Sequence, residues 1–148
     1  MRLAALQEEL SWAENKKLVG TEVELLIAEG EGRKDGATHR ISGRARDNRL
    51  VHVAVGDLSG SALPRPGDLV RTTITYAAPF HLVADGPAEP GSANGGSGIT
   101  ELRRMPSGDA WAARQAAKEA GSSHGAGVSL GMPSIGVPAP LAPASACG

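Results

Sequence analysis

The sequence contains almost no cysteine and few aromatic residues. Its one cysteine, Cys147, lies next to the C-terminal residue, so the chain alone can form neither an internal disulfide nor a site of several thiolates. Two Trp, one Tyr and one Phe are the only aromatic residues among 148. Proteins that hold single-stranded nucleic acid by stacking usually offer several rings, so we expect recognition of backbone and shape rather than of stacked bases.

Long hydrophobic runs are also missing. No stretch approaches the roughly 18 to 20 apolar residues that a membrane-spanning helix needs. Glu8, Glu9 and Glu14 interrupt the N-terminal segment too early for a signal peptide. We therefore expect a cytoplasmic protein with no membrane partner.

Glycine and proline are abundant, and they concentrate in the second part of the chain. Residues 87–148 hold 11 of the 20 glycines and 7 of the 10 prolines. Such a composition buries too little apolar surface to offset the entropy of ordering. We expect a mostly disordered tail there, in which a short helix over 109–120 can form, and we expect the folded unit within residues 1–86.

Residues 2–19 are predicted to form a linker helix. Apolar residues recur at spacings of three and four and give one stripe, made of Leu3, Leu6, Leu10 and Ala13. No capping residue precedes this helix, so we expect it to be part of something longer. Its stripe needs a surface to pack on, either the following strands or a domain upstream.

From Thr21 the hydrophobic period changes to two. We expect five strands, over 21–29, 39–46, 49–55, 69–77 and 80–85. Short strands with turn signals about every 8 to 12 residues are typical of small barrels. The predicted fold of 20–86 is mainly β, a small five-stranded antiparallel OB-like barrel, in which Gly43 marks a bend or bulge.

A basic segment crosses the second and third expected strands. The net charge of the chain is −1, yet residues 33–49 carry six cations against Asp35 and Asp47, a local balance of +4. On the second strand, alternation places Arg40, Ser42, Arg44 and Arg46 on one face. Such a face can bind phosphates in a neutral protein. The alternative is a solvated face that balances the acidic residues of the preceding segment, Glu22, Glu24, Glu29 and Glu31.

Residues 2–86 resemble a TRAM domain. The resemblance is carried by Leu6-Gln7-Glu8-Glu9-Leu10, by Asn15-Lys16-Lys17-Leu18-Val19-Gly20, by Val23-Glu24-Leu25-Leu26-Ile27-Ala28-Glu29-Gly30, by Gly43-Arg44-Ala45-Arg46-Asp47-Asn48, and by Gly67-Asp68 followed by Phe80-His81-Leu82-Val83-Ala84-Asp85-Gly86. The chain is most similar to the C-terminal part of actinobacterial MiaB-type tRNA methylthiotransferases, a radical-SAM family.

This resemblance implies a barrel that grips tRNA near the anticodon. The residues we expect to contact RNA are Arg33, Lys34, Arg40, Arg44, Arg46, Asn48 and Arg49. The arginines and the lysine would bind phosphates. Asn48 would contact a base edge or, as we favour, serve only as a turn former.

The family converts N6-dimethylallyladenosine beside the anticodon into its 2-methylthio derivative, with 4Fe-4S clusters and S-adenosylmethionine as cofactors. The resemblance places the cluster-binding cysteines, including a C-x-x-x-C-x-x-C set, in upstream radical-SAM domains that this sequence lacks. With a single cysteine the chain is expected to hold no cofactor and to perform no catalysis alone.

Two functions stay open at this point. In the first, the chain is a tRNA-binding module, and the missing catalytic domain supplies sequence specificity. In the second, it is a structural or docking domain whose helix stripe and Trp12 pack on that catalytic partner, without independent RNA binding. A stand-alone RNA chaperone is a third reading, disfavoured by the acidic first strand and by the uncapped helix.

For the remaining aromatic residues, the histidines and the serines, the sequence predicts structural rather than catalytic roles. Phe80 begins a strand and is expected in the core, whereas Tyr76 fits either core or surface. Four histidines, His39, His52, His81 and His124, lack metal-ligand spacing, so we expect them to be solvated or hydrogen-bonded. No nucleophile motif surrounds any serine, so hydrolase chemistry is not expected.

Overall fold

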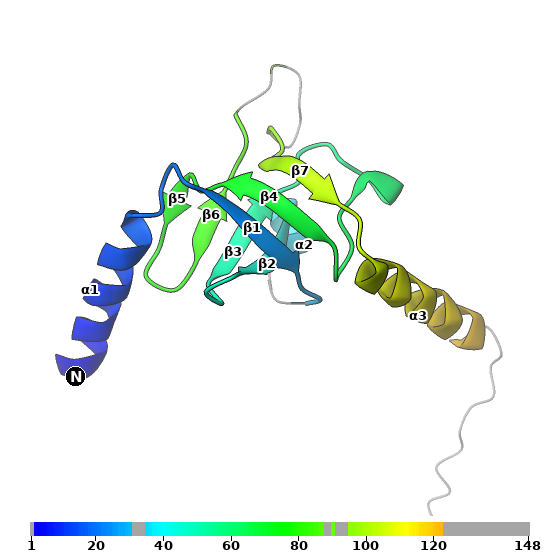
Figure 1. Cartoon of the computed structure of the whole chain (residues 1–148), viewed down its shortest axis with the longest axis horizontal. Helices are drawn as coiled ribbons and strands as arrows, with labels where there is room; N and C mark the ends of the chain where they lie inside the picture. The colour runs from blue at the N-terminus through cyan, green and yellow to red at the C-terminus, as the bar shows by residue number, and fades with distance from the viewer. Residues whose placement is uncertain (1, 31–34, 88–89, 91–94, 123–148) are drawn as a thin grey trace, which may run out of the picture.

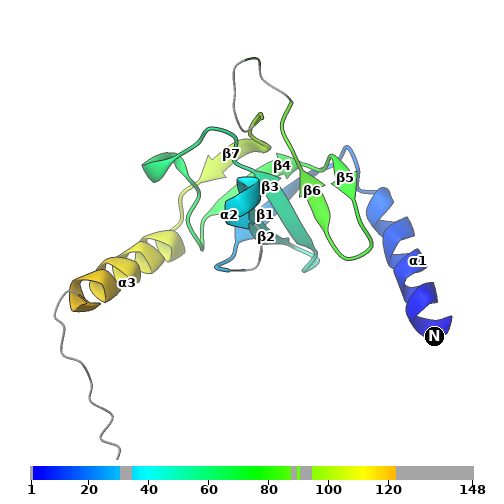
Figure 2. The same ribbon diagram turned by 180° about the vertical axis from the view of Figure 1, so that it is seen from behind.

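The computed structural model describes residues 2–30, 35–87, 90 and 95–122. The elements are α1 (Arg2–Lys16), β1 (Glu22–Ile27), α2 (Asp35–Thr38), β2 (Arg40–Ala45), β3 (Leu50–Ala54), a 3₁₀ turn (Gly60–Ala62), β4 (Leu69–Thr73), β5 (Tyr76–Ala77), β6 (Leu82–Ala84), β7 (Ile99–Arg103) and α3 (Pro106–Ser122). Figures 1 and 2 show one curved sheet, with α1 and α3 extending away from it on opposite sides.

The strands form one mixed sheet in the order β5-β6-β3-β2-β1-β4-β7. Neighbours are antiparallel except β3 and β6, which are parallel. β4 and β5 are distant in this order but consecutive in the chain. The two residues between them form backbone hydrogen bonds with segments from opposite halves of the strand order. The Ile74 amide donates to the Thr21 carbonyl at 3.0 Å, and the Thr75 amide donates to the Val83 carbonyl at 2.8 Å. The sheet therefore curls over its core although its strand order is not closed.

The predicted class, mainly β with an N-terminal helix, is confirmed, and the details of the sheet differ. The expected strand over 69–77 is divided into β4 and β5 by the bend at Ile74-Thr75. β5 pairs with β6 in an antiparallel hairpin. β6 in turn lies beside β3 and runs parallel to it. A seventh strand, β7, lies beyond the expected boundary at residue 86.

The core lies inside the curl of the sheet. It consists of Leu25, Val51, Val53, Ile74, Ala77, Leu82 and Ala84. Gly43 of β2 is buried beside this core, and a Cβ there would lie 2.8 Å from the Leu26 carbonyl oxygen. The β2 register continues unbroken through Gly43 on both sides. The glycine thus permits close approach of two strands, and the bulge expected there is found instead at Arg71/Thr72 of β4.

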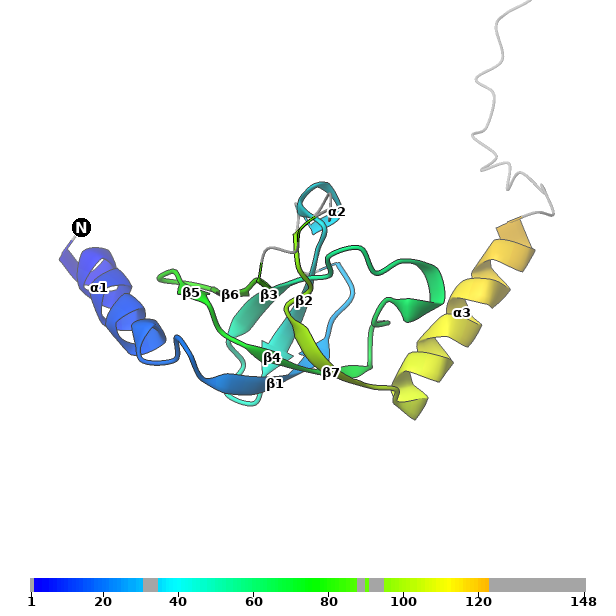
Figure 3. The ribbon, with the colours of Figure 1, turned by 90° about the horizontal axis from the view of Figure 1, so that it is seen from above.

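Helix α1 is attached to the sheet by its C-terminal half. The Trp12 indole Nε1 donates to the Ala77 carbonyl at 3.0 Å, and the buried Asn15 amide donates to the carbonyls of Ala78 at 2.7 Å and Pro79 at 3.1 Å. The N-terminal half extends away from the sheet (Figure 3). Its apolar stripe therefore does not pack on the strands, and Leu3, Leu6 and Leu10 are 79%, 51% and 58% exposed.

Part of the segment expected to be a tail is folded against the sheet. β7 pairs antiparallel with β4, and α3 contains the helix expected over 109–120. Glycines make this possible, because a Cβ at Gly98 would lie 2.1 Å from the Ala84 carbonyl oxygen. The Thr72 hydroxyl also donates to the Gly98 carbonyl at 2.5 Å. These contacts join residues far apart in sequence, which composition alone does not reveal.

Candidate nucleic-acid interface

The β2–β3 hairpin carries three of the expected RNA-binding cations: Arg44, Arg46 and Arg49. We call these three residues the basic hairpin. The turn is fixed by bonds from the Ala45 amide to the Arg49 carbonyl, 3.0 Å, and from the Asn48 amide to the Ala45 carbonyl, 2.9 Å. Asn48 has φ +65°, a left-handed conformation that asparagine tolerates better than most residues. This geometry supports the turn-forming reading of Asn48.

The side chains of the basic hairpin are near the surface. The Arg44 guanidinium donates to the Asn48 carbonyl at 3.1 Å, and Arg49 Nε lies 3.1 Å from the Asp47 carboxylate. Arg46 is exposed, and within the described part of the chain no carboxylate pairs with it. A guanidinium group is suited to bidentate contacts with phosphate oxygens.

Arg40 lies at the opposite end of β2 and has a different environment. Its Nε and Nη2 donate to the two carboxylate oxygens of Asp85 at 3.0 and 2.7 Å. This hydrogen bonding raises the pKa of Arg40, although burial opposes the shift. The structure thus separates Arg40 from the basic hairpin and engages it in a bidentate pair that ties β2 to the end of β6. Arg33 and Lys34 lie outside the described residues.

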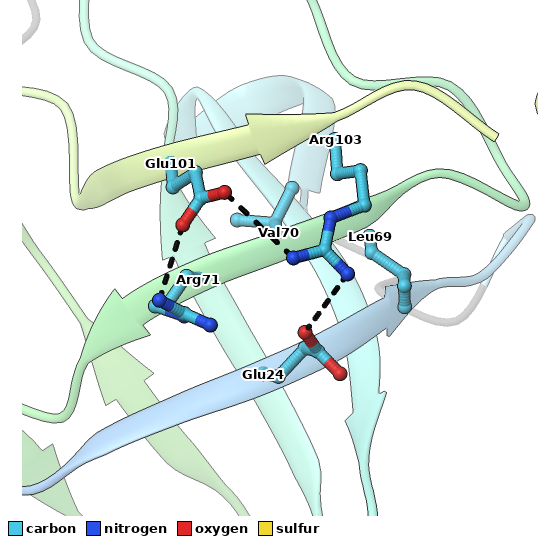
Figure 4. A pocket seen from close by; sticks show the side chains of 6 residues that line it. All are labelled: Glu24, Leu69, Val70, Arg71, Glu101 and Arg103. Carbon is cyan, nitrogen blue, oxygen red and sulfur yellow. Dashed lines mark ion pairs between the residues drawn. The ribbon is translucent and has the colours of Figure 1, made fainter.

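The glutamates of β1 are balanced by residues other than the basic hairpin. Figure 4 shows a charge ladder of β1, β4 and β7 side chains, made of Glu24, Arg71, Glu101 and Arg103. Arg71 lies 3.3 Å from Glu22 and 3.1 Å from Glu101, and Arg103 lies 3.9 Å from Glu24. Glu22 and Glu24 are thus paired with arginines outside the basic hairpin. Glu31, Arg33 and Lys34 lie outside the described residues, so the alternative of a solvated face that balances Glu22, Glu24, Glu29 and Glu31 is not tested.

A partly buried polar cluster links α2 to β2 and β3, and it was not predicted from the sequence. The Ser42 hydroxyl donates to Asp35 Oδ2 at 2.5 Å and lies 2.7 Å from His52 Nδ1. His52 Nδ1 is 3.3 Å from Asp35 Oδ1. The cluster fastens α2 to β2 and β3, the elements that carry the basic hairpin. In a hairpin centred on Asp47, Ser42 pairs with His52. The predicted strand register could therefore have revealed this contact from the sequence.

The other histidine near this cluster, His81, contacts the His52 ring edge-on at 5.2 Å between centroids. Burial lowers the pKa of His81, and the neighbouring His52 lowers it further. Ser42 and Asp35 both approach the same imidazole nitrogen, so this is not a nucleophile–base–acid relay. Among the described residues, no group of three or more His, Cys, Asp or Glu side chains is placed to hold a metal ion.

The expectation for Phe80 was wrong, because this side chain is 67% exposed. Phe80 precedes β6 in the connection from β5, and Tyr76 of β5 is also exposed, at 57%. A groove of about 370 Å³ lies between α1 and this connection, and it is lined by Leu10, Ser11, Glu14, Asn15, Arg49, Pro79 and Phe80. One residue of the basic hairpin, Arg49, thus borders a partly apolar hollow.

A membrane-spanning helix is not found in the part of the chain that the structure describes, since none there is both long and apolar enough. No known family profile matches the sequence. The chain is instead similar to curated proteins that bear a single name, tRNA-2-methylthio-N(6)-dimethylallyladenosine synthase.

The relative from a Nocardioides species is 56% identical over 146 residues, which are 99% of this chain and 26% of the relative. Those from Streptomyces avermitilis and Streptomyces coelicolor are each 54% identical over 99% of this chain and 26% of their own length. The chain therefore spans about a quarter of the length of the curated relatives it matches. Nearly all of the chain is similar to part of proteins named tRNA-2-methylthio-N(6)-dimethylallyladenosine synthase, and that name agrees with the resemblance found in its sequence.

Proposed function

We propose that this chain is the tRNA-binding TRAM module of a tRNA-2-methylthio-N6-dimethylallyladenosine synthase. In this proposal it holds the anticodon region of tRNA in the cytoplasm, while radical-SAM domains outside this chain carry the 4Fe-4S clusters, bind S-adenosylmethionine and methylthiolate the adenosine beside the anticodon. The relatives' shared name supports the substrate. The observation that carries the binding role is the basic hairpin, in which three arginines lie at or beside a turn whose backbone is hydrogen-bonded.

The hairpin suits phosphate for an electrostatic reason. Glu22 and Glu24 of β1 pair with Arg71 and Arg103. Residues 44–49 contain three arginines against one carboxylate, Asp47, which pairs with Arg49, so this segment has a positive balance of charge. Each phosphate that an arginine neutralises releases condensed counterions, and this makes the affinity depend on salt.

The test is binding of the full chain to an unmodified tRNA that carries adenosines at positions 36 and 37, measured over a salt series. The double variant Arg44→Ala/Arg46→Ala should bind at least about tenfold more weakly at low salt. The plot of log affinity against log salt should become shallower by about 1.5, since each lost phosphate contact removes somewhat less than one unit.

The matched control is Arg2→Ala/Arg114→Ala, which removes the same charge from exposed positions on α1 and α3. We expect it to bind nearly as well as the unchanged chain. Equal losses of tRNA affinity in both double variants would show that only the net charge matters. If neither the unchanged chain nor the variants bound tRNA at low salt, the proposed tRNA-binding function would be refuted.

The docking function is the second candidate, and one observation favours it. Leu3, Leu6 and Leu10 form an exposed stripe on α1 that no described strand covers. In this reading the stripe packs on the radical-SAM part of the synthase. Changing Leu3 and Leu6, which do not line the groove beside Phe80, to serine should then abolish co-purification of the chain with that part, while RNA affinity stays unchanged.

A further inference from the structure

The groove between α1 and the β5–β6 connection joins an exposed ring to the edge of the basic hairpin. Phe80 and Pro79 line one side, and Arg49 of the hairpin lines the same hollow. The groove holds about 370 Å³, which is room for one planar heterocycle. No described core residue depends on the Phe80 ring, because that ring is 67% exposed.

The connection that presents Phe80 is held firmly from two directions. The Ala78 amide donates to the His81 carbonyl at 2.9 Å, which closes the turn around the ring. Asn15 of α1 donates to the carbonyls of Ala78 and Pro79. An exposed apolar ring contributes little to folding, whereas a backbone held in place beneath it lowers the entropy lost when a ligand packs on the ring.

The two sides of the groove offer different chemistry. The apolar side, Phe80 with Pro79 and Leu10, suits the face of an aromatic ring. The cationic side is Arg49, whose guanidinium suits a phosphate. Glu14 is the acidic lining residue, and its carboxylate is engaged by Lys17 at 2.6 Å. A planar uncharged base with a phosphate next to it matches this combination better than a purely aliphatic protein surface does.

We propose that this groove receives one unstacked base of a single-stranded RNA segment, stacked on Phe80, with the adjoining phosphate on Arg49. The inference rests on the proposed RNA binding and adds a specific contact to it. A stacked base is held through its π face, which all four bases share. The groove should therefore bind any unpaired nucleotide, and it should distinguish single-stranded from fully paired RNA.

The test uses the full chain with two probes, a short unpaired RNA oligonucleotide and the same sequence annealed to its complement. Phe80→Leu keeps the apolar volume and removes the ring. It should weaken binding of the unpaired probe about tenfold, leave the salt dependence unchanged, and change binding of the duplex by less than twofold. Phe80→Tyr should restore the affinity. Tyr76→Leu is the matched control, since it removes an exposed ring outside the groove.

The outcomes separate the two proposals. If the unchanged chain binds the probes with a salt-dependent affinity and Phe80→Leu binds equally well, RNA binding stands and the stacking site is overturned; the groove would then be free for a protein segment. Equal losses in Phe80→Leu and Tyr76→Leu would also overturn the site. If the unchanged chain binds neither probe, both proposals fail together. Circular dichroism spectra of each variant would exclude loss of fold as the cause.

Discussion

At the scale of single residues, Asp68 is the most constrained side chain of the described structure. It is fully buried, yet its carboxylate accepts hydrogen bonds from the Arg65 and Arg104 guanidinium groups and from the amides of Arg65 and Met105. Burial alone would raise the pKa of Asp68, but these donors outweigh it and hold the pKa well below its usual range. One carboxylate thereby fixes the start of β4 to the beginning of α3.

This environment makes a pH-dependent contribution to stability. The folded pKa of Asp68 lies below its unfolded value, so its contribution is complete above the unfolded pKa of about 4 and is lost as the pH falls below it. Asp68→Asn removes the charge and should lower the free energy of unfolding by about 2 to 3 kcal/mol at neutral pH. Urea unfolding from neutral to acidic pH should show the two proteins converging below about pH 4. Equal stability at neutral pH would contradict this account.

The aromatic residues Tyr76 and Phe80 lie on the surface. Both are exposed, although the prediction that Phe80 begins a strand placed it in the core. The strand starts only at Leu82, and Phe80 belongs to the connection before it. A two-residue difference in where the strand begins therefore moved the ring from the interior to the surface.

At the scale of elements, α1 depends on a few contacts with the strands. A 15-residue helix is marginal in water without tertiary support. Here the support comes from Trp12 and Asn15, which reach the backbone carbonyls of Ala77, Ala78 and Pro79. Lys16 adds a cation–π contact at 3.9 Å from the Trp12 ring centre.

Asn15→Ala should therefore release α1 without unfolding the sheet. Two buried hydrogen bonds are lost, and each is worth about 0.5 to 1.5 kcal/mol. In hydrogen exchange with mass spectrometric detection, amides of residues 2–16 should exchange about tenfold faster, whereas those of β2 and β3 keep their protection. Gln7→Ala, an exposed change on the same helix, should leave both unaltered. Unchanged exchange of α1 in Asn15→Ala would show that its attachment lies elsewhere.

At the scale of the whole molecule, the folded unit includes residues beyond 86. β7 covers the outer edge of β4, and Arg104 and Met105 complete the hydrogen bonding of Asp68. A chain cut after residue 86 would keep the curled sheet but would leave the β4 edge and a buried carboxylate partly unpaired.

We expect residues 1–86 to be less stable than residues 1–122 by at least about 3 kcal/mol, because several ladder hydrogen bonds and two donors to a buried charge are lost. Residues 1–122 should match the full chain. Urea midpoints of the three proteins provide the measurement. Identical midpoints for residues 1–86 and 1–122 would show that β7 and α3 are independent of the sheet.

The sequence by itself determined the local features of this protein. Alternation of apolar residues specified β1 to β4, spacings of three and four specified α1, and Asp47-Asn48 specified the turn between β2 and β3. Each depends on residues that are neighbours in the chain, so a single-sequence pattern contains the information. The concentration of arginines that defines the basic hairpin is visible for the same reason.

Tertiary structure alone decided which distant charges pair with one another. Arg40 meets Asp85 across 45 residues, and Asp68 meets Arg104 across 36. Such pairs depend on strand register and on the path of the chain, and local sequence patterns do not contain this information. β7 also depends on a distant contact, because its few apolar residues give no clear strand pattern and the segment forms a strand by pairing with the edge of β4. Long-range pairing, and not composition, therefore joined β7 to the sheet and separated Arg40, paired with Asp85, from the basic hairpin.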